Sequence, residues 1–537
     1  MSSGELLTLA LERAGTRNVF TLNGGHIWPI LLGAAEHGIR LVGVRHEQTA
    51  AFAAEGWSKL TRECGVCAVT AGPGVTNTVS AIAGAWGSDT PLLALGGRSP
   101  LSTEGTGSLQ EMDHVPVLRS ITKFARTARS AEDVYPAVGE ALRAALSGRP
   151  GPAFVDVPLD VFFGVAELPD GPPPPLDPGP EPDPEEVRRA AGCLRSARRP
   201  AVVAGSGVWW AHAESELVQL VEAAGIPAVL NGLARGMLAP EHELCATRGR
   251  RVALGEADLV LVVGVPLDFR LGFGRSPVIG EGAEIVYVDF DGRRRHRQGA
   301  ACLDGDVRRS LAALTAALEG GAPDPGWLPS VREAALAARR ADEELAVSDS
   351  SPVHPARVVA EVSKRLDPDA VVIGDGGDFV SFVGRMVEAG RPGCFLDPGP
   401  FGCLGSGVGY ALAARLAHPS RQVVVFNGDG AFGFSAMDFE TLVRERLPVV
   451  AVIGNNGIWA TEKHPMKRML GVDVAADLRP GVRYDQVVAA LGGYGELVEE
   501  AGEVGPAFER ALKSGVPAVL NVITDPEAEY PRSAVLI

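Results

Sequence analysis

The residues best placed for chemistry in this sequence are an aspartate and a pair of asparagines that follow it about 26 positions later. Asp429 lies in a Gly-Asp-Gly at the end of the apolar run QVVVFNGDG, and Asn455 and Asn456 end the run LPVVAVIGNN. Both runs predict buried strands that end in tight turns, and AFGFSAMDFETLVRER between them has the apolar spacing of a helix. Asp429 and Asn456 are therefore expected at the carboxyl ends of two strands in one β-α-β unit.

That position favours ligand binding, because open parallel sheets bind ligands in the crevice beyond the carboxyl ends of their strands. A carboxylate and an amide oxygen are hard ligands that suit Mg²⁺ or Ca²⁺ and suit soft metals poorly. Mg²⁺ usually keeps few protein ligands and completes its coordination with water and phosphate oxygens. The pair therefore predicts a magnesium ion together with a phosphorylated cofactor.

Composition limits the class of protein. The chain has 537 residues, a hydrophobic fraction of 46% and a charged fraction of 22%, as in soluble globular enzymes. Its formal net charge of -16 disfavours nucleic acid and anionic membranes as partners. Cys64 and Cys67 form a lone CxxC with no second pair, so zinc or redox use is not expected. With no signal peptide and no long apolar run, we expect a cytoplasmic protein.

Two proline-rich breaks divide the chain. The first is ELPDGPPPPLDPGPEPDPEE and the second is EGGAPDPGWLPS, which an Ala-rich helix follows. The predicted division is a first domain at 1–166, a linker at 167–186, a central domain at 187–320, a linker helix at 321–349 and a third domain at 350–537. Each domain alternates short apolar strands with amphipathic helices, which predicts three doubly wound α/β domains with parallel sheets.

The Gly-Asp-Gly and Asn-Asn pair resembles the diphosphate-binding signature of thiamine diphosphate enzymes. The resemblance implies that Asp429, Asn456 and the backbone carbonyl of Ile458 bind Mg²⁺. It also implies that the neighbouring Gly428, Gly430 and Ala431 contact the cofactor. The three domains would then be a pyrimidine-binding domain, a central Rossmann-like domain and a diphosphate-binding domain.

A second segment matches the same family independently. VGVRHEQTAAFAAEGWSKL places Glu47 between a strand and a helix and resembles the segment that carries the family's activating glutamate. The resemblance implies that Glu47 hydrogen-bonds the pyrimidine ring nitrogen of the cofactor. TAGPGVTNTVSAIAGAWGSDTPLLALGG resembles the pyrimidine-binding domains of acetolactate synthases. Because the family builds its site from two subunits, we expect a homodimer at least, and the resemblance favours a homotetramer.

In the third domain, DPGPFGCLGSGVGYALAARL resembles the segment whose bulky apolar residue bends the cofactor, and that residue is Leu404 by position. An ordinary buried leucine is the alternative.

The substrate is harder to predict, because three relatives share parts of the pattern. GTGSLQEMDHVPVLRSITKFA resembles the acetolactate synthase segment with a substrate-side glutamine, here Gln110. After Asn456 that family continues toward a Trp, whereas here Trp459 comes too early and Pro465 stands near the expected place. Its flavin-binding elements are not recognisable, so FAD is not expected.

TLNGGHIWP resembles the Gly-X-His-Ile element of benzaldehyde lyase. It places His26 before a helix, where an imidazole can relay protons to a bound hydroxyl, with Gly25 on the cofactor side. The alternative for His26 is a structural role at a helix start.

NNGIWATEKHPMKRMLGVDVAADL and the ending ITDPEAEYPRSAVLI resemble actinobacterial 2-hydroxyacyl-CoA lyase-like proteins, in which a glutamate after the asparagines acts as an acid-base residue. The matching residue is Glu462, with a plain surface carboxylate as the alternative.

An acyl-CoA substrate needs a nucleotide site, and EIVYVDFDGRRRHRQG in the central domain offers one. Asp289 at a strand end can hydrogen-bond a ribose, and a cluster of arginines suits phosphates. The residues are Asp289, Arg293, Arg294, Arg295 and Arg297. A solvated loop or an interdomain ion-pair patch is the alternative, and CoA, ADP or flavin would use the same crevice.

The sequence therefore predicts a carbon-carbon lyase or carboligase that depends on thiamine diphosphate and Mg²⁺ and acts on a small molecule. The favoured reaction is reversible cleavage of a 2-hydroxyacyl-CoA to a carbonyl compound and formyl-CoA. The alternative is decarboxylation and condensation of 2-oxo acids such as pyruvate, as in acetolactate synthase, or acyloin cleavage as in benzaldehyde lyase. The predicted catalytic residues are Glu47, His26, Gln110 and Glu462.

Overall fold

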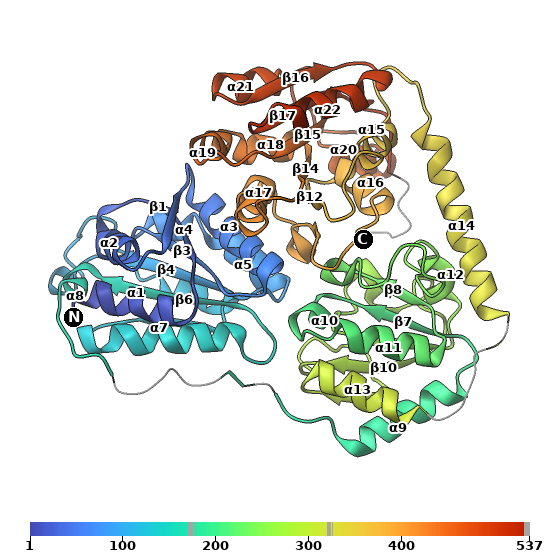
Figure 1. The fold of residues 1–537 in the computed structure, drawn as a ribbon, viewed down its shortest axis with the longest axis horizontal. Coiled ribbons are helices and arrows are strands. Elements are labelled where there is room, and N and C mark those ends of the chain that lie inside the picture. Colours follow the sequence, from blue (N-terminus) through green and yellow to red (C-terminus); the bar gives the residue numbers. More distant parts are fainter. Residues whose placement is uncertain (170–175, 178, 319–323, 325, 531–537) are drawn as a thin grey trace.

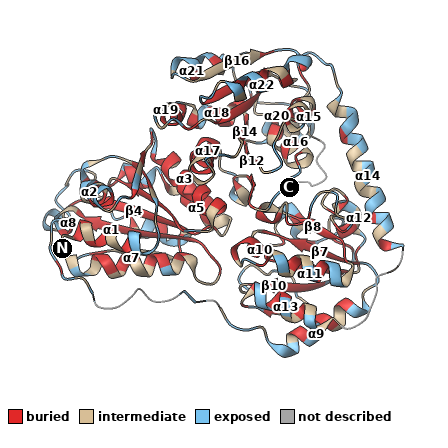
Figure 2. Cartoon of the chain, viewed as in Figure 1, coloured by how far each residue is buried: buried red, intermediate tan, exposed pale blue. Residues whose placement is uncertain are grey.

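The computed structural model describes residues 1–169, 176–177, 179–318, 324 and 326–530 (Figure 1). Three α/β domains follow one another along the chain, and the strands within each of the three sheets pair in parallel. This confirms the predicted fold class. Figure 2 shows that the strands are almost entirely buried, while the helices alternate buried and exposed residues. Continuous apolar strands with helices on both faces are the pattern expected of parallel sheets.

The first domain holds a six-stranded sheet in the order β2-β1-β3-β4-β6-β5. Its strands are β1 (Asn18–Leu22), β2 (Arg40–Gly43), β3 (Gly65–Val69), β4 (Leu92–Arg98), β5 (Phe124–Thr127) and β6 (Pro152–Pro158). Its helices are α1 (Ser3–Arg13), α2 (Trp28–Glu36), α3 (Glu47–Thr61), α4 (Pro73–Thr76), α5 (Val79–Gly87), α6 (Val115–Leu118), α7 (Ala131–Leu146) and α8 (Leu159–Phe162).

The central domain holds a five-stranded sheet in the order β11-β10-β9-β7-β8. Its strands are β7 (Pro200–Ala204), β8 (Ala228–Leu230), β9 (Leu259–Val263), β10 (Glu284–Asp289) and β11 (Ala301–Asp304). Its helices are α9 (Pro184–Ser196), α10 (Ser206–Trp210), α11 (Glu214–Ala224), α12 (Arg250–Gly255) and α13 (Val307–Ala317). Helix α14 (Trp327–Ala346) then runs along the outside of the molecule to the third domain (Figure 1).

The third domain holds a six-stranded sheet in the order β13-β12-β14-β15-β17-β16. Its strands are β12 (Val371–Asp375), β13 (Phe395–Leu396), β14 (Val423–Gly428), β15 (Val450–Asn455), β16 (Tyr494–Val498) and β17 (Ala518–Ile523). Its helices are α15 (Pro355–Ser363), α16 (Asp378–Met386), α17 (Ser406–Ala417), α18 (Asp429–Ser435), α19 (Phe439–Arg444), α20 (Ala460–Leu470), α21 (Tyr484–Ala490) and α22 (Val504–Lys513).

Equivalent elements of the first and third domains meet. The two sheets have the same strand order, and the helices that follow their edge strands, α3 and α17, pack against each other. Close approach needs glycine here, since a Cβ on Gly409 would lie 2.7 Å from the Phe52 side chain. A buried polar cluster also crosses this contact. Lys59 Nζ lies 2.9 Å from both Glu55 Oε1 and the Tyr410 hydroxyl, which donates to Glu55 Oε2.

Two expectations about local structure are changed by the fold. The single helix predicted after Asp429 is divided into α18, a 3₁₀ turn at Ala436–Asp438 and α19. The turn directs Asp438 to the first domain, where its carboxylate accepts hydrogen bonds, which a continuous helix would not provide. The segment predicted as a linker also contains the start of a helix, because Asp183 caps α9 at Pro184. Parts of both proline-rich breaks, and residues 531–537 of the ending quoted above, lie outside the described residues.

Candidate cofactor site

A cavity of about 230 Å³ lies beyond the carboxyl ends of β12, β14 and β15 in the third domain. It brings together most of the residues predicted for the cofactor and metal, and one predicted near the substrate, Glu462. Its lining includes Leu404, Gly428, Asp429, Gly430, Ala431, Asn456, Ile458, Trp459, Thr461 and Glu462. The β-α-β prediction for the two motifs is therefore correct in position.

Asp429 is the first residue of α18 and is 3% exposed. Its Oδ2 accepts a hydrogen bond of 3.0 Å from the backbone N–H of Gly457. Burial raises the pKa of this carboxyl to about 6, and no cation among the described residues offsets it. A bound metal ion would stabilise the charged form of a buried carboxylate that has no other cation beside it.

The other oxygens at this place are neutral. Asn456 is half-buried, and its Oδ1 accepts from the backbone N–H of Ile458 at 3.2 Å. The described residues contain no group of three or more His, Cys, Asp or Glu side chains that could hold a metal. One carboxylate with amide and carbonyl oxygens fits a hard ion that keeps water and phosphate ligands, so the residues present suit Mg²⁺.

Packing explains why the second residue after Gly428 in Gly-Asp-Gly is a glycine. A Cβ on Gly430 would lie 2.4 Å from the ring of Trp459, which covers this part of the cavity. The early tryptophan that breaks the acetolactate synthase pattern is thus a wall of the cavity. The hydroxyl of Thr461, in the same lining, has no hydrogen-bond partner among the described residues.

Leu404 is held by a residue that the sequence reasoning missed. Asp375, at the end of β12, accepts hydrogen bonds from the backbone N–H groups of Gly405 at 3.0 Å and Gly407 at 2.8 Å. Both follow Leu404, so the carboxylate fixes the turn that carries this side chain into the cavity. The sequence showed only GDGG at a strand end, and the loop that it binds lies about 30 residues later.

The remaining predicted residues form a separate group in the first domain. Glu47 is the first residue of α3 and is buried, and Asn77 Nδ2 donates to its Oε2 at 2.9 Å. His26 Nδ1 lies 3.2 Å from Thr70 Oγ1, and that hydroxyl lies 3.3 Å from Gln110 Oε1. Burial lowers the pKa of His26, so its imidazole is neutral near pH 7.

Gln110 has a φ of 58°, a strained value for a residue with a side chain. Gly25 is exposed and has open space around it. Asn77 and Thr70 were not predicted, although both lie in the quoted segment around GPGVTN.

In the described part of the chain, the third-domain cavity does not extend to the first-domain group. Every residue of the lining of the third-domain cavity comes from residues 376–462, and none from the first domain. A site that used Glu47 and Asp429 on one cofactor would need the first domain of another chain.

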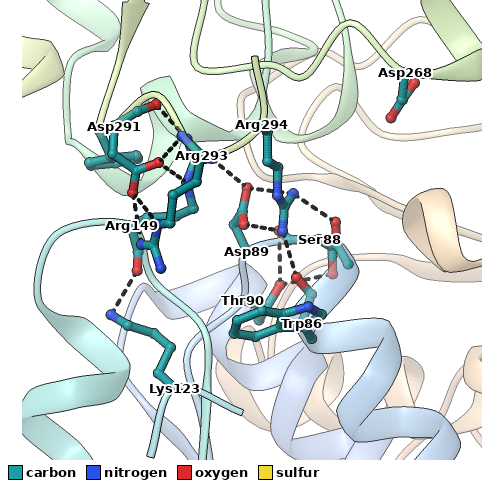
Figure 3. A network of polar contacts seen from close by, with 12 residues as sticks. Trp86, Ser88, Asp89, Thr90, Lys123, Arg149, Asp268, Asp291, Arg293 and Arg294 are labelled. Carbon is teal, nitrogen blue, oxygen red and sulfur yellow. Dashed lines mark hydrogen bonds and ion pairs between the residues drawn. The ribbon is translucent and has the colours of Figure 1, made fainter. Parts of the chain in front are cut away.

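The arginines predicted to bind a nucleotide contact protein groups, and Figure 3 shows two of them, Arg293 and Arg294. Arg149 of the first domain is buried and pairs with Asp289 at 2.8 Å, Asp89 at 3.1 Å and Asp291 at 3.4 Å. Arg294 crosses to the first domain, where it pairs with Asp89 at 2.8 Å and donates to the Trp86 carbonyl at 2.9 Å.

The other members of the cluster have partners within the central domain. Arg293 pairs with Asp291, Arg295 pairs with Asp304, and Arg297 donates to the carbonyls of Gly274 and Ala283. Of the residues predicted for the nucleotide, Arg294 and Asp289 therefore form ion pairs between domains, as the alternative interpretation has it, and the other three bind within the central domain. The crevice beyond the central strands, which Arg294 also lines, is a cavity of about 40 Å³.

The CxxC pair lies in the core of the first domain. Cys64 and Cys67 are buried, and burial raises the pKa of each thiol to about 12, so both remain protonated.

Comparison with known proteins identifies the family. Three family descriptions match consecutive parts of the chain: the N-terminal TPP binding domain of thiamine pyrophosphate enzymes at 1–117, the central domain at 187–314 and the C-terminal TPP binding domain at 375–522. The chain is 52% identical over 544 residues to a probable acetolactate synthase of Mycobacterium bovis, covering 99% of this chain and 97% of that protein. The chain belongs to the thiamine pyrophosphate enzymes.

Other members of this family are more distant. The human 2-hydroxyacyl-CoA lyase 2 is 34% identical over 573 residues, covering 97% of this chain and 89% of that protein. The bovine 2-hydroxyacyl-CoA lyase 2 is also 34% identical, over 570 residues. The comparisons therefore favour the alternative reaction, that of acetolactate synthase, over the cleavage of a 2-hydroxyacyl-CoA. The reason is that the greater similarity is to proteins named acetolactate synthase. The chain is a thiamine diphosphate-dependent enzyme that acts on carbon-carbon bonds. None of the helices in the described part of the chain has the length and apolar character that crossing a membrane requires.

Proposed function

We propose that this thiamine diphosphate enzyme decarboxylates a 2-oxo acid such as pyruvate and joins the product to a second 2-oxo acid, as acetolactate synthase does. The observation that carries the proposal is the state of the central domain. A CoA substrate needs a nucleotide site, but the arginines predicted for it bind protein groups. The adjoining cavity of about 40 Å³ is much smaller than the third-domain cavity of about 230 Å³.

The cofactor would be held by the third domain. Asp429, Asn456 and the carbonyl of Ile458 would bind Mg²⁺, and Gly428, Gly430 and Ala431 would line the diphosphate. Leu404, fixed by Asp375, would bend the cofactor from the same cavity. Once bound, thiamine diphosphate supplies a carbon that becomes nucleophilic after losing its proton and adds to a substrate carbonyl.

The first domain would supply the proton chemistry. Glu47, oriented by Asn77, would hydrogen-bond the pyrimidine ring nitrogen. His26, neutral because of its burial, would accept or return a proton at the substrate oxygen. Thr70 links His26 to Gln110, so these two substrate-side residues would move together.

This arrangement needs a second copy of the chain. Since the cavity with Asp429 contains no residue of the first domain, a partner chain would bring its Glu47 to complete the site. We therefore infer at least a homodimer, with a homotetramer as the larger assembly.

A 2-hydroxyacyl-CoA lyase remains the second candidate because of one observation. Glu462 is exposed at its position in the cavity lining, where a carboxylate can exchange a proton with a bound substrate.

A direct assay separates the two reactions. Purified protein with thiamine diphosphate and Mg²⁺ is given pyruvate in one reaction and a short 2-hydroxyacyl-CoA in another, without oxygen. Acetolactate from pyruvate is the expected result, with Glu47→Gln protein as the blank. Formyl-CoA and an aldehyde or ketone from the second reaction, with no acetolactate from the first, would overturn the proposal.

The pH dependence of cofactor loading is a second expected result. The pKa of Asp429 is raised to about 6, so below that pH the carboxyl is protonated and must lose a proton to bind Mg²⁺. The apparent affinity for thiamine diphosphate at fixed Mg²⁺ should fall as the pH drops through 6, approaching about tenfold per pH unit for one proton. Fluorescence titrations between pH 5 and 7.5 measure it.

For the cofactor-free protein, the same raised pKa makes the free energy of unfolding depend on pH in the opposite direction. Its unfolded form loses the Asp429 proton first, so this residue's contribution to stability is present at low pH and is lost as the pH rises toward 6. Asp429→Asn should remove the carboxyl's part of both dependences, and an unchanged slope in that variant would assign the proton to another group.

A further inference from the structure

The start of α3, where Glu47 lies, is held by a carboxylate from the third domain. Asp438 Oδ1 accepts a hydrogen bond of 2.7 Å from the backbone N–H of Arg45, and its Oδ2 accepts one of 2.5 Å from the hydroxyl of Thr49. Thr441 donates to Oδ1 at 3.0 Å. Asp438 is 2% exposed, so all three bonds are shielded from water.

These bonds bracket Glu47 on both sides. Arg45 lies two residues before it and Thr49 two residues after it, so a single carboxylate fixes the backbone before the helix and a side chain in its first turn. A charge-assisted bond is shorter and stronger than a neutral one, and burial increases its effect. The direction in which the Glu47 side chain leaves α3 therefore depends on Asp438.

A 3₁₀ turn places the carboxylate of Asp438 against the first domain. Asp438 ends the 3₁₀ turn at Ala436–Asp438 that interrupts the predicted helix, nine residues after Asp429. Other contacts cross the same seam between the domains, such as Arg40 with Glu445 at 2.9 Å. That pair lies in solvent-accessible positions and does not touch α3, so it joins the domains without orienting Glu47.

We propose that Asp438, acting with Thr49, is a positioning residue that aims Glu47 at the pyrimidine ring of the cofactor. The inference rests on the role proposed above for Glu47. It assigns to the third domain a part in cofactor activation in addition to holding the diphosphate. Asp438 itself does not reach the cofactor, because it does not line the cavity.

Thr49→Val gives the sharpest test. Valine has the shape of threonine without the hydroxyl, so it removes the bond to Asp438 Oδ2 with little change in packing, whereas Thr49→Ser keeps the hydroxyl. Arg40→Ala is the matched control, since it breaks another contact of the same seam.

The first readout uses cofactor-free protein. Hydrogen exchange of the backbone amides over residues 44–50, followed by mass spectrometry, should become faster in Thr49→Val and remain unchanged in Thr49→Ser and Arg40→Ala. Equal exchange in all three variants and the parent would overturn the inference.

The second readout uses loaded protein without substrate. Deuterium uptake from D₂O at the reactive carbon of bound thiamine diphosphate should slow by about tenfold or more in Thr49→Val, the range for residues that orient a ligand through another group. Thr49→Ser should restore it, and cofactor affinity should stay within a few-fold. Normal uptake in Thr49→Val would reject the positioning role.

Glu47→Gln separates the positioning role of Asp438 from the role proposed for Glu47. If it slows uptake while Thr49→Val does not, the positioning inference alone fails. If Glu47→Gln leaves uptake unchanged, the proposed role of Glu47 fails first. Neither measurement depends on which substrate the enzyme uses.

Discussion

Glu47→Gln should reduce turnover by about 10²–10⁴-fold, the range in which positioned acid-base groups contribute. The amide keeps the size of the side chain and its contact with Asn77, but it removes the carboxyl that would hydrogen-bond the pyrimidine ring nitrogen. Glu47 is buried at the first residue of α3, so bulk water has little access to the position of its carboxyl. Steady-state kinetics with the substrate that the proposed assay identifies would measure the loss.

Cofactor affinity separates this effect from misfolding. Because the substitution leaves the proposed metal and diphosphate contacts of the third domain intact, thiamine diphosphate should bind the variant within a few-fold of the parent. Glu63→Gln, an exposed carboxyl just beyond the end of α3, is a control that should leave turnover unchanged. Turnover near the parent level in Glu47→Gln would remove the residue from the mechanism.

Asp429→Ala should weaken thiamine diphosphate binding by at least about 100-fold at fixed Mg²⁺, since loss of a direct ligand should exceed the 10–100-fold cost of losing a residue behind one. The substitution removes the buried charge of this site and leaves Asn456 and the Ile458 carbonyl as neutral oxygens only. Titration of the cofactor at several Mg²⁺ concentrations would show that the substitution weakens the binding of both Mg²⁺ and thiamine diphosphate.

Stability offers an independent check. The parent carboxylate is costly to bury without a metal, so Asp429→Ala protein without cofactor should unfold at the same temperature or higher near pH 7. Asp369→Ala, at a partly exposed ion pair with Arg421 in the same domain, is the matched control for binding. Unchanged affinity in Asp429→Ala would place the metal elsewhere.

The sequence predicts the framework of this enzyme well, because local pattern decides where buried strands end. QVVVFNGDG and LPVVAVIGNN place Asp429 and Asn456 correctly at one edge of a sheet. Residues that act across domains are different. Asp438 meets Arg45 across 393 positions of sequence, and Asp375 reaches Gly405 across 30. Nothing local marks these carboxylates as ligands of backbone N–H groups.

The arginine cluster shows a second limit. Charged residues have the same sequence pattern whether they bind a phosphate or a carboxylate of the same protein. Two of the partners come from the first domain: Asp89 lies 205 residues before Arg294, and Arg149 lies 140 residues before Asp289. Only the packing of the two domains shows that the charges are already paired.

The buried cluster at the contact of α3 with α17 has a consequence for registry. Sliding α3 along α17 by one turn, about 5.4 Å, would separate Lys59 and Glu55 from Tyr410 and leave polar groups buried without partners. Breaking such a set costs several kcal/mol, far more than the loss of a few apolar contacts. The two domains therefore have one docking position rather than a range, and Glu47, eight residues before Glu55 on the same helix, takes its axial position from that choice.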